Sequence, residues 1–299
     1  MDGIVNVYKE KNYTSHDVVA ILRGVLRTKK IGHTGTLDPQ ATGVLPVCLG
    51  KATKVAELIM GTQKEYIAEL AFGTETDTQD ADGAVTRRQD YRFDAEEARQ
   101  AIQSFCGEYE QLPPMYSAVK VGGVKLYEMA RMGMEVERKP RRVTIAETEI
   151  LELNEKGARL RIVCSKGTYI RTLCEDIGRR TGYLAHMTAL ERTASGPYRV
   201  ENSFRIDELK SLMQQKRQKE FLTDLDELFA EYPSKTVIPE EDILLRNGNY
   251  LTYNAAEIPP IIGQTVRMYT SDGGFVGLYQ VTELPAPGRV RLRAYKMFV

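Results

Sequence analysis

A single acidic residue, Asp38, stands in the segment KKIGHTGTLDPQATGVLPVCLGKATK at residues 29–54, which is otherwise rich in glycine, threonine and proline. One interpretation is a tight turn, since Asp before Pro favours type I turns and the Asp side chain can bond its own backbone. The alternative is a reactive carboxylate, because Gly35 and Gly43 let a ligand approach closely. An ionised carboxylate held by a cation from elsewhere in the chain suits nucleophilic or base chemistry. These residues alone leave both interpretations open.

Other patterns that could carry chemistry fail on their spacing. The segment that ends in Gly50-Lys51 has Leu45 where a phosphate-binding loop needs its first glycine. The acidic segment at 78–89 has Thr and Gln where a calcium-binding loop needs its first and twelfth ligands. The three histidines are widely spaced, so no metal site is expected. No serine lies in a Gly-x-Ser-x-Gly elbow, which disfavours that type of hydrolase.

The elements expected around Asp38 mix helices and strands. An amphipathic helix is predicted to begin near Thr14, and the glycine-rich segment after it is too broken to be a regular element. A strand is predicted at 65–72, followed by an acidic loop and by a helix that Asp94 caps. Alternation predicts a β-hairpin within 143–164, and helical periodicity follows at 168–182.

The remaining segments differ in character. Residues 111–133 mix proline, glycine and basic residues and are expected to form a long surface loop that leads into a short helix. Residues 205–232 are acidic and predicted to be helical. A domain boundary is expected at 232–239, because short strands with many glycines and prolines follow it. The fold class is therefore predicted as α+β, with a mixed, largely antiparallel sheet and a small C-terminal all-β domain.

The bulk composition bounds the class of protein. With 299 residues, 42% hydrophobic and 27% charged, the chain is expected to be globular, with a main domain and an appendage. No apolar run is long enough to span a bilayer, and the N-terminus lacks the features of a secretory signal. The four cysteines are scattered without a Cys-x-x-Cys pair, which indicates reduced thiols in a cytoplasmic protein.

The net charge of zero conceals local segregation. Residues 115–145 hold 7 basic and 3 acidic side chains, and residues 156–199 hold 9 basic and 3 acidic ones. Such segments could present a positive face to nucleic-acid phosphates, or they could be solvated faces without a partner. Composition does not decide between the two.

The segment around Asp38 strongly resembles the central motif of the TruB family of tRNA pseudouridine synthases. Other motifs of the family are similar to further segments of this chain, in the same order and at similar spacing, from residue 3 to about residue 210. The first segment departs from the family where Glu10-Lys11-Asn12 replaces the usual Pro-x-Gly. The segments similar to the other motifs are KNYTSHDVVAILR, KEYIAEL, PPMYSAVKVGGVKLYEMAR, CSKGTYIRTLCEDIG and GYLAHMTALERTASGPY.

The resemblance implies a fold and a domain organisation. It implies a pseudouridine synthase catalytic domain at residues 1–232, with an RNA-facing insertion at about 112–142. The segment at 235–299 resembles a shortened or divergent PUA domain, which is a small RNA-binding β-barrel.

The resemblance also implies roles for individual residues. Asp38 matches the catalytic aspartate, Arg171 the arginine that pairs with it, and Tyr66 the aromatic residue that stacks on the target base and is proposed to take a proton. From the residues alone, Arg171 could equally be a surface helical charge paired with Glu175, and Tyr66 an ordinary strand tyrosine. The resemblance implies substrate contacts by His33, Lys9, Lys64, Tyr169 and Leu190.

The implied reaction isomerises uridine to pseudouridine at position 55 in the T loop of tRNA, after the base has been flipped out. It needs no cofactor and no metal, and its implied partner is the tRNA T-arm, with no membrane and no protein partner required. Three alternatives stay open. They are a non-catalytic RNA-binding or RNA-folding protein, a guide-RNA-dependent relative, and a glycosidase with paired carboxylates, for which the matched motifs offer no second acid.

Overall fold

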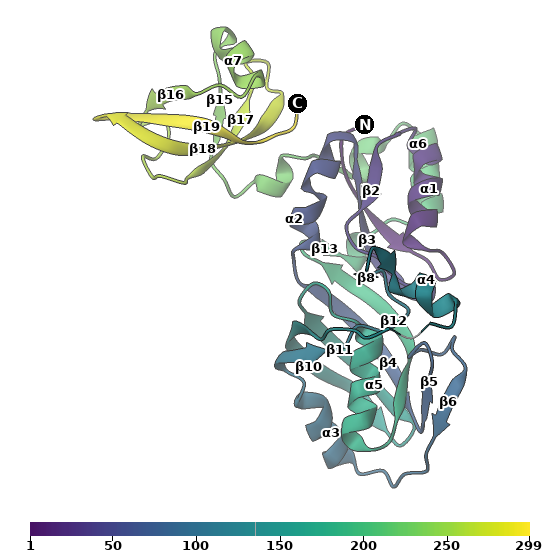
Figure 1. Ribbon diagram of the computed structural model, residues 1–299. Helices are drawn as coiled ribbons and strands as arrows, with labels where there is room; N and C mark the ends of the chain where they lie inside the picture. The colour runs from purple at the N-terminus through teal and green to yellow at the C-terminus, as the bar shows by residue number, and fades with distance from the viewer. Residues whose placement is uncertain (135) are drawn as a thin grey trace.

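The computed structural model describes residues 1–134 and 136–299; residue 135, within the insertion predicted at about 112–142, lies outside the described part. Two sheets dominate, a ten-stranded sheet and a smaller five-stranded sheet that carries the C-terminus (Figure 1). None of the helices in the described part of the chain is long and apolar enough to cross a membrane.

The large sheet is antiparallel at every pairing except the short parallel contact between β12 and β3. Two further strands, β2 (Ile31–His33) and β13 (Tyr198–Arg199), pair with β3 and β12 outside the main order. The main order is β14 (Leu222–Thr223), β1 (Gly3–Lys9), β3 (Thr42–Leu49), β12 (Ala185–Ser195), β4 (Lys64–Phe72), β11 (Gly157–Cys164), β10 (Arg141–Asn154) and β7 (Gly107–Gln111).

Helices cover the large sheet in two groups. Helices α3 (Ala95–Gln103) and α5 (Ile170–Thr181) pack on the inward side chains of β4, β11 and β12, while α1 (Ser15–Val25) and α6 (Ile206–Gln214) pack on β1 and β3. The opposite face of β4, β10 and β11 carries charged side chains, as expected of an antiparallel sheet with one solvated face. The shorter elements are η1 (Gly50–Val55), α2 (Ala56–Met60), β5 (Thr74–Thr76), β6 (Val85–Arg88), β8 (Lys120–Val121), β9 (Val124–Lys125), α4 (Leu126–Arg131), η2 (Val200–Asn202), η3 (Gln218–Glu220) and η4 (Glu227–Phe229).

The C-terminal sheet is curled and has a hydrophobic core of its own. It meets the large sheet through aromatic side chains, since the ring of Phe229 stacks on that of Phe298 with centroids 5.9 Å apart. Lys54 of η1 donates to the backbone carbonyl of Val299 at the chain end. The strand order of the C-terminal sheet is β15 (Ser234–Thr236), β17 (Thr265–Tyr269), β18 (Phe275–Ala286), β19 (Arg289–Met297) and β16 (Leu251–Asn254). In the chain, η5 (Pro239–Glu241) and α7 (Asp242–Arg246) follow β15.

Much of the secondary structure follows the local sequence signals. Thr14 caps α1 in a reciprocal capping box with Asp17, and Asp94 caps α3. Helix α5 ends at Gly182, which has the left-handed conformation (φ 72°) that favours glycine. The predicted hairpin is β10–β11. The α+β class with a largely antiparallel sheet is confirmed.

The prediction that the glycine-rich segment contains no regular element is wrong. Residues 42–49 form β3, an interior strand that is almost wholly buried. Pro46 is tolerated there because β3 pairs along its full length only with β1 on one side. On its other side it meets β12 at residues 42–43 and β2 at 47–49, and Pro46 lies between these two contacts.

Three further expectations need correction. Residues 205–232 are α-helical only at α6, after which the chain forms short 3-10 turns and the edge strand β14. The acidic segment after β4 contains the strand β5, paired with β6. The segment at 111–133 does lead into the short helix α4, but it also contains the small hairpin β8–β9.

Candidate active site

The loop that carries Asp38 joins β2 to β3 and is anchored on both sides of the acid. The amide of Leu37 donates to Ser15 Oγ (2.9 Å) at the start of α1, and Leu37 and Ala41 are buried in the same cluster as Tyr66. The amide of Ala41 donates to the carbonyl of Asp38 (3.1 Å), which closes a β-turn. The turn and the available carboxylate are therefore both present, since the turn leaves the Asp38 side chain 40% exposed.

The carboxylate of Asp38 forms an ion pair with Arg171 of α5. Arg171 Nε lies 2.9 Å from Asp38 Oδ2, and the Arg171 side chain is only 6% exposed. The alternative of a surface arginine paired with Glu175 is wrong, because Glu175 pairs instead with Arg179 one turn later. The geometry brings a buried cation to a half-exposed carboxylate.

The remaining nitrogens of Arg171 fix the orientation of its guanidinium. Nη1 donates to the carbonyl of Thr78 (2.9 Å) and Nη2 to the carbonyl of Tyr116 (2.9 Å). A second carboxylate, that of Asp80, lies 3.6 Å from Nη1. The guanidinium therefore meets Asp38 through Nε, because Nη1 and Nη2 bind the loop after β5 and the segment before β8.

The loop that supplies Thr78 and Asp80 is held by Gln79. The Gln79 side chain donates to Glu175 Oε2 (2.6 Å) and accepts from Thr172 Oγ1 (2.9 Å), both on α5. Burial is the main cause that raises the pKa of Glu175 above its ordinary value. The helix that carries Arg171 thus also fixes the loop that binds Arg171.

Tyr66 and Leu190 lie on the inward face of the sheet. Tyr66 is 9% exposed on β4, in the hydrophobic cluster against which half-buried Leu190 of β12 packs. Burial raises the pKa of Tyr66 above its ordinary value. The structure brings both residues into the cluster that holds the flanks of Asp38.

The ammonium groups of Lys9 and Lys64 differ from the expected substrate contacts, because both are buried against backbone carbonyls. Lys9 Nζ donates to the carbonyls of Glu10, Tyr13 and Pro39. Lys64 Nζ is bound in the same way at the end of α2. Desolvation lowers the pKa of each to about 8. These lysines tie chain segments together.

His33 and Tyr169 flank the two ends of the ion pair. His33 Nδ1 accepts from the amide of Gly35 (3.3 Å) on the Asp38 loop, and burial lowers the pKa of His33. Tyr169 precedes α5, and its backbone exchanges two hydrogen bonds with the side chain of Gln111. Both side chains are half-buried.

Two charged residues at the site were not anticipated from the sequence. Asp80 lay in an acidic segment with no motif to distinguish it. Arg192 follows Leu190 by two positions in a strand, and this spacing places both on the inward face. No strand was predicted at 185–195, so this spacing was not recognised from the sequence.

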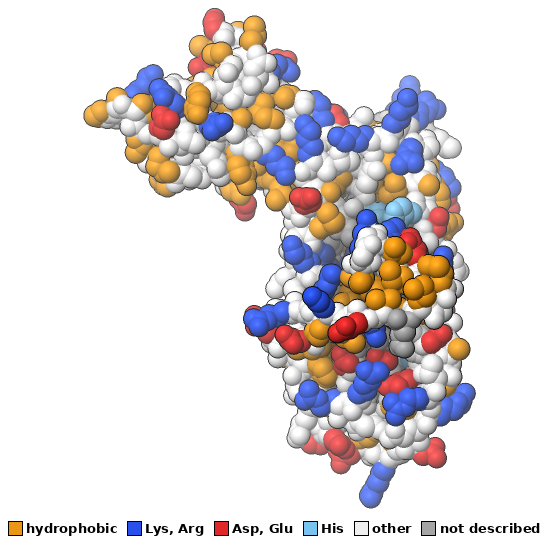
Figure 2. Space-filling model, in the orientation of Figure 1, with side chains coloured by type: hydrophobic (Ala, Val, Ile, Leu, Met, Phe, Trp, Pro, Cys, Tyr) orange, Lys and Arg blue, Asp and Glu red, His pale blue; other side chains and the backbone are white. Residues whose placement is uncertain are grey.

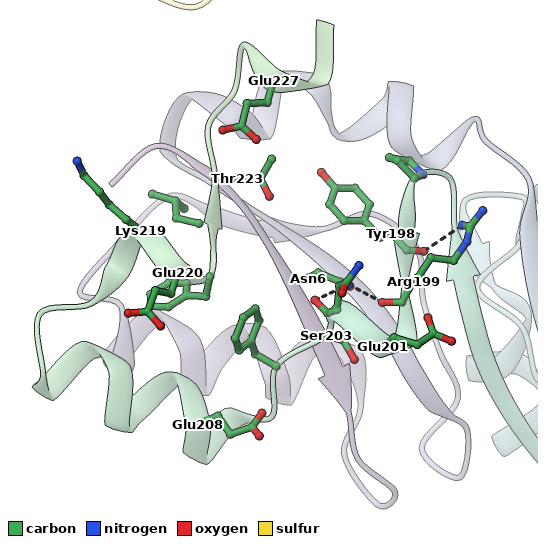
Figure 3. Close-up of a pocket in the computed structure, with 15 residues that line it drawn as sticks. Asn6, Tyr198, Arg199, Glu201, Ser203, Glu208, Lys219, Glu220, Thr223 and Glu227 are labelled. Atoms are coloured by element: carbon green, nitrogen blue, oxygen red, sulfur yellow. Dashed lines mark hydrogen bonds between the residues drawn. The ribbon is translucent and has the colours of Figure 1, made fainter. Parts of the chain in front are cut away.

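A groove in the surface lies elsewhere. It has a volume of about 670 Å³ and is lined by residues of β1, β13 and β14, with Tyr198 and Asn6 inside it (Figure 3). None of the residues around Asp38 lines it. Among the described residues, no group of three or more His, Cys, Asp or Glu side chains could hold a metal ion.

Comparison with known proteins agrees with the motif order. Residues 23–170 match the TruB family pseudouridylate synthase (N terminal domain), and residues 171–244 match the tRNA pseudouridylate synthase B C-terminal domain. A protein of Alkaliphilus oremlandii named tRNA pseudouridine synthase B is 44% identical over 280 residues, which are 93% of this chain and 92% of that protein. The chain belongs to the TruB family. A Geobacillus kaustophilus protein of the same name is 52% identical over 218 residues, 70% of this chain and 76% of the relative.

Solved structures support the TruB-family fold. A structure titled as a Cbf5-Nop10-Gar1 complex has a TM-score of 0.70 and 26% identity, covering 99% of this chain and 85% of that one. A structure of an H/ACA RNP bound to a substrate RNA containing 2'-deoxyuridine has the same TM-score at 23% identity, which shows the fold alone. The resemblance found in the sequence is confirmed at the level of the family. Membership of the TruB family makes the chain an enzyme, a pseudouridine synthase.

Proposed function

We propose that this chain isomerises uridine to pseudouridine at position 55 in the T loop of tRNA, with the carboxylate of Asp38 as the catalytic group. The observation that carries the proposal is the ion pair between half-exposed Asp38 and buried Arg171. The substrate class is supported by the relatives named tRNA pseudouridine synthase B.

The reaction rearranges bonds without an external group. The N1–C1′ bond of uridine breaks and a C5–C1′ bond forms, while the proton on C5 is lost and N1 gains one, so no oxidant or reductant is needed. Asp38, held in place by its ion pair with Arg171, acts on the nucleoside as a nucleophile or base. In this scheme Tyr66 stacks on the base and accepts a proton, and Leu190 forms the apolar wall of the pocket.

A uridine inside folded RNA must first be turned out to reach Asp38, at a cost of a few kcal/mol. The segment before α4 supports this step, because it contacts Arg171 through the carbonyl of Tyr116. Figure 2 shows hydrophobic side chains gathered over this part of the molecule. The exposed apolar residues there are Leu112 and Val124 before α4 and Met132 and Met134 after it. Apolar surface of this kind can replace the stacking that the flipped base loses.

The predicted RNA-binding charges are only partly available. Arg159 and Arg161 of β11 face acidic side chains of β4 and β10, and Arg179 pairs with Glu75. These three charges of the basic segment at 156–199 are therefore already paired within the protein, which favours the solvated-face interpretation for them. Within 115–145, Lys120, Lys125 and Arg131 form no ion pair with any described residue, so these three support phosphate contact.

The remaining parts of the proposal concern the setting of the enzyme. We propose a cytoplasmic enzyme that acts on the T-arm without a cofactor or a protein partner, with residues 1–232 as the catalytic domain and 235–299 as a PUA-like RNA-binding domain. The guide-RNA-dependent alternative has one observation in its favour, namely the fold likeness to a protein solved within an H/ACA RNP.

A single assay separates these alternatives. Purified chain is incubated with an unmodified T-arm transcript and no other macromolecule, and pseudouridine is mapped by carbodiimide treatment and primer extension. The proposal predicts modification at position 55 alone. A requirement for added RNA or protein would favour the guide-dependent alternative, and binding without modification would favour the non-catalytic one.

A further inference from the structure

Arg192 of β12 is a large charged side chain that the fold buries almost completely. It is 2% exposed, among the largest fully buried side chains. Its Nε donates to the carbonyl of Val44 (2.7 Å) and its Nη2 to the carbonyl of Gly35 (3.2 Å). Within the described residues no carboxylate lies within 4.0 Å of it. A buried cation without a paired anion is destabilising, and arginine cannot escape by losing its proton.

The two carbonyls that Arg192 binds bracket the Asp38 loop. Gly35 precedes Asp38 by three residues, and Val44 follows it at the start of β3. Strand β12 approaches β3 most closely here, because a Cβ added to Gly43 would overlap the carbonyl oxygen of Arg192. Arg192 thus fastens both ends of the loop to the sheet.

The same residue lies beside Tyr66. Arg192 and Tyr66 are directly opposite each other in the antiparallel register of β12 and β4. Residues in this relation project from the same face of a sheet with their Cβ atoms about 5 Å apart. The positive charge of Arg192 lowers the pKa of Tyr66, against the larger effect of burial, and it also lowers the pKa of His33.

We propose that Arg192 is a positioning residue for the isomerisation, which holds the Asp38 loop in register with Tyr66 and favours Tyr66 as a proton acceptor. The proposal rests on the function proposed above, in which Tyr66 takes a proton. It explains why the fold keeps an uncompensated guanidinium at this place. Arg192 acts through Tyr66 and the loop, and its side chain needs no contact with the RNA.

A double-mutant cycle tests the connection to Tyr66. Single-turnover rates are measured for the wild type, Arg192→Gln, Tyr66→Phe and the double variant, on whichever uridine the wild type modifies. We expect Arg192→Gln to slow turnover about tenfold or more while RNA affinity changes by less than about twofold. The double variant should be no slower than Tyr66→Phe alone, within about twofold. Rates in the double variant that equal the product of the single losses would overturn the proposal.

The pH profile gives an independent readout. Without the Arg192 charge the pKa of Tyr66 rises further above its ordinary value, so the deficit of Arg192→Gln relative to wild type should stay constant near neutral pH and shrink only once the pH exceeds the pKa that Tyr66 has in the wild type. A deficit that does not shrink at such alkaline pH contradicts a role through Tyr66.

Two further variants control for folding. Arg199→Gln removes another arginine that donates to backbone carbonyls, but it lines the groove of Figure 3, which none of Asp38, Tyr66 and Arg171 lines, and should leave turnover unchanged. Should Arg192→Gln fail to fold by circular dichroism, the cycle is run with Arg192→Met, which also removes the charge. The same non-additivity is expected, and a multiplicative loss again overturns the proposal. If the wild type does not modify position 55, the proposed substrate is refuted. The double-mutant cycle still tests the role of Arg192, because its rates are measured on whichever uridine the wild type modifies.

Discussion

The ammonium nitrogen of Lys9 lies 3.2 Å from the carbonyl oxygen of Pro39, the residue that follows Asp38. Lys9 is fully buried at the end of β1 and also binds the carbonyls of Glu10 and Tyr13. One cation therefore joins the end of β1, the approach to α1 and the Asp38 turn. The position of the carboxylate depends on this contact as well as on Arg171.

Replacing Lys9 by methionine should move Asp38 without removing it. The variant keeps most of the side-chain volume but leaves three carbonyls without their donor. We expect single-turnover isomerisation to slow about tenfold, with RNA affinity within about twofold of wild type. Lys51→Met, at an exposed lysine, is the matched control. Equal rates for Lys9→Met and Lys51→Met would show that the contacts of Lys9 with the three carbonyls are dispensable for the reaction.

The lowered pKa of Lys9 predicts a pH dependence of stability. Its pKa is about 8 in the folded protein, below the 10.5 of the unfolded chain. Between these values the unfolded state binds more protons, so the contribution of Lys9 to the free energy of unfolding rises with pH. The stability difference between wild type and Lys9→Met should grow by on the order of 2 kcal/mol from pH 7.5 to pH 10. Urea denaturation at the two pH values measures it, and a difference that falls would contradict the sign.

The close approach of β3 and β12 predicts a strong effect at Gly43. Its φ of 101° strains any other residue, and an added Cβ would overlap the backbone of Arg192. Gly43→Ala should therefore destabilise the protein by about 2 kcal/mol or more. Gly32→Ala is the control, because nothing lies within 4 Å of a Cβ added there. Equal denaturation midpoints for the two variants would contradict this account of the strand contact.

The charges of the segment before and within α4 predict the salt dependence of RNA binding. Replacing Lys120, Lys125 and Arg131 by glutamine should flatten the plot of log affinity against log salt by about 0.7–0.9 for each phosphate that the variant no longer neutralises. Replacing Arg159 and Arg161 should leave the slope unchanged, since their charges face Glu69 and Glu65. Fluorescence anisotropy between about 50 and 300 mM salt, a range chosen to span physiological values, measures both. If replacing Arg159 and Arg161 changes the slope more than replacing Lys120, Lys125 and Arg131 does, the assignment of phosphate contact to these three residues is wrong.

Some features of the fold could be predicted because their signals lie within a few residues of each other in the sequence. Thr14, Asp94 and Gly182 act within one helical turn, so the ends of α1, α3 and α5 could be predicted. The motif around Asp38 and the one around Arg171 predicted that these residues meet, and they do. Both signals are short stretches of chain that need no knowledge of the fold.

The remainder depended on partners distant in the sequence. Counting charges along the sequence did not show that the arginines of β11 are paired, because Arg161 forms ion pairs with Glu65, Glu147 and Glu149 on neighbouring strands. Lys9 and Lys64 could not be recognised as tethers, since the carbonyls that bind them become neighbours only in the folded chain. The role of β3 was missed because its glycine and proline are tolerated only where particular strands stop pairing.

The central claim, that the ionised Asp38 carboxylate carries the chemistry, is tested most directly by the single-turnover rate of Asp38→Asn on an unmodified T-arm transcript. Asparagine keeps the shape of the turn but removes the charge that Arg171 holds. Asp90→Asn, at an exposed acid, is measured beside it. The account predicts no detectable pseudouridine with Asp38→Asn, RNA affinity within about twofold of wild type, and full activity of Asp90→Asn. Turnover by Asp38→Asn at the wild-type rate would contradict it.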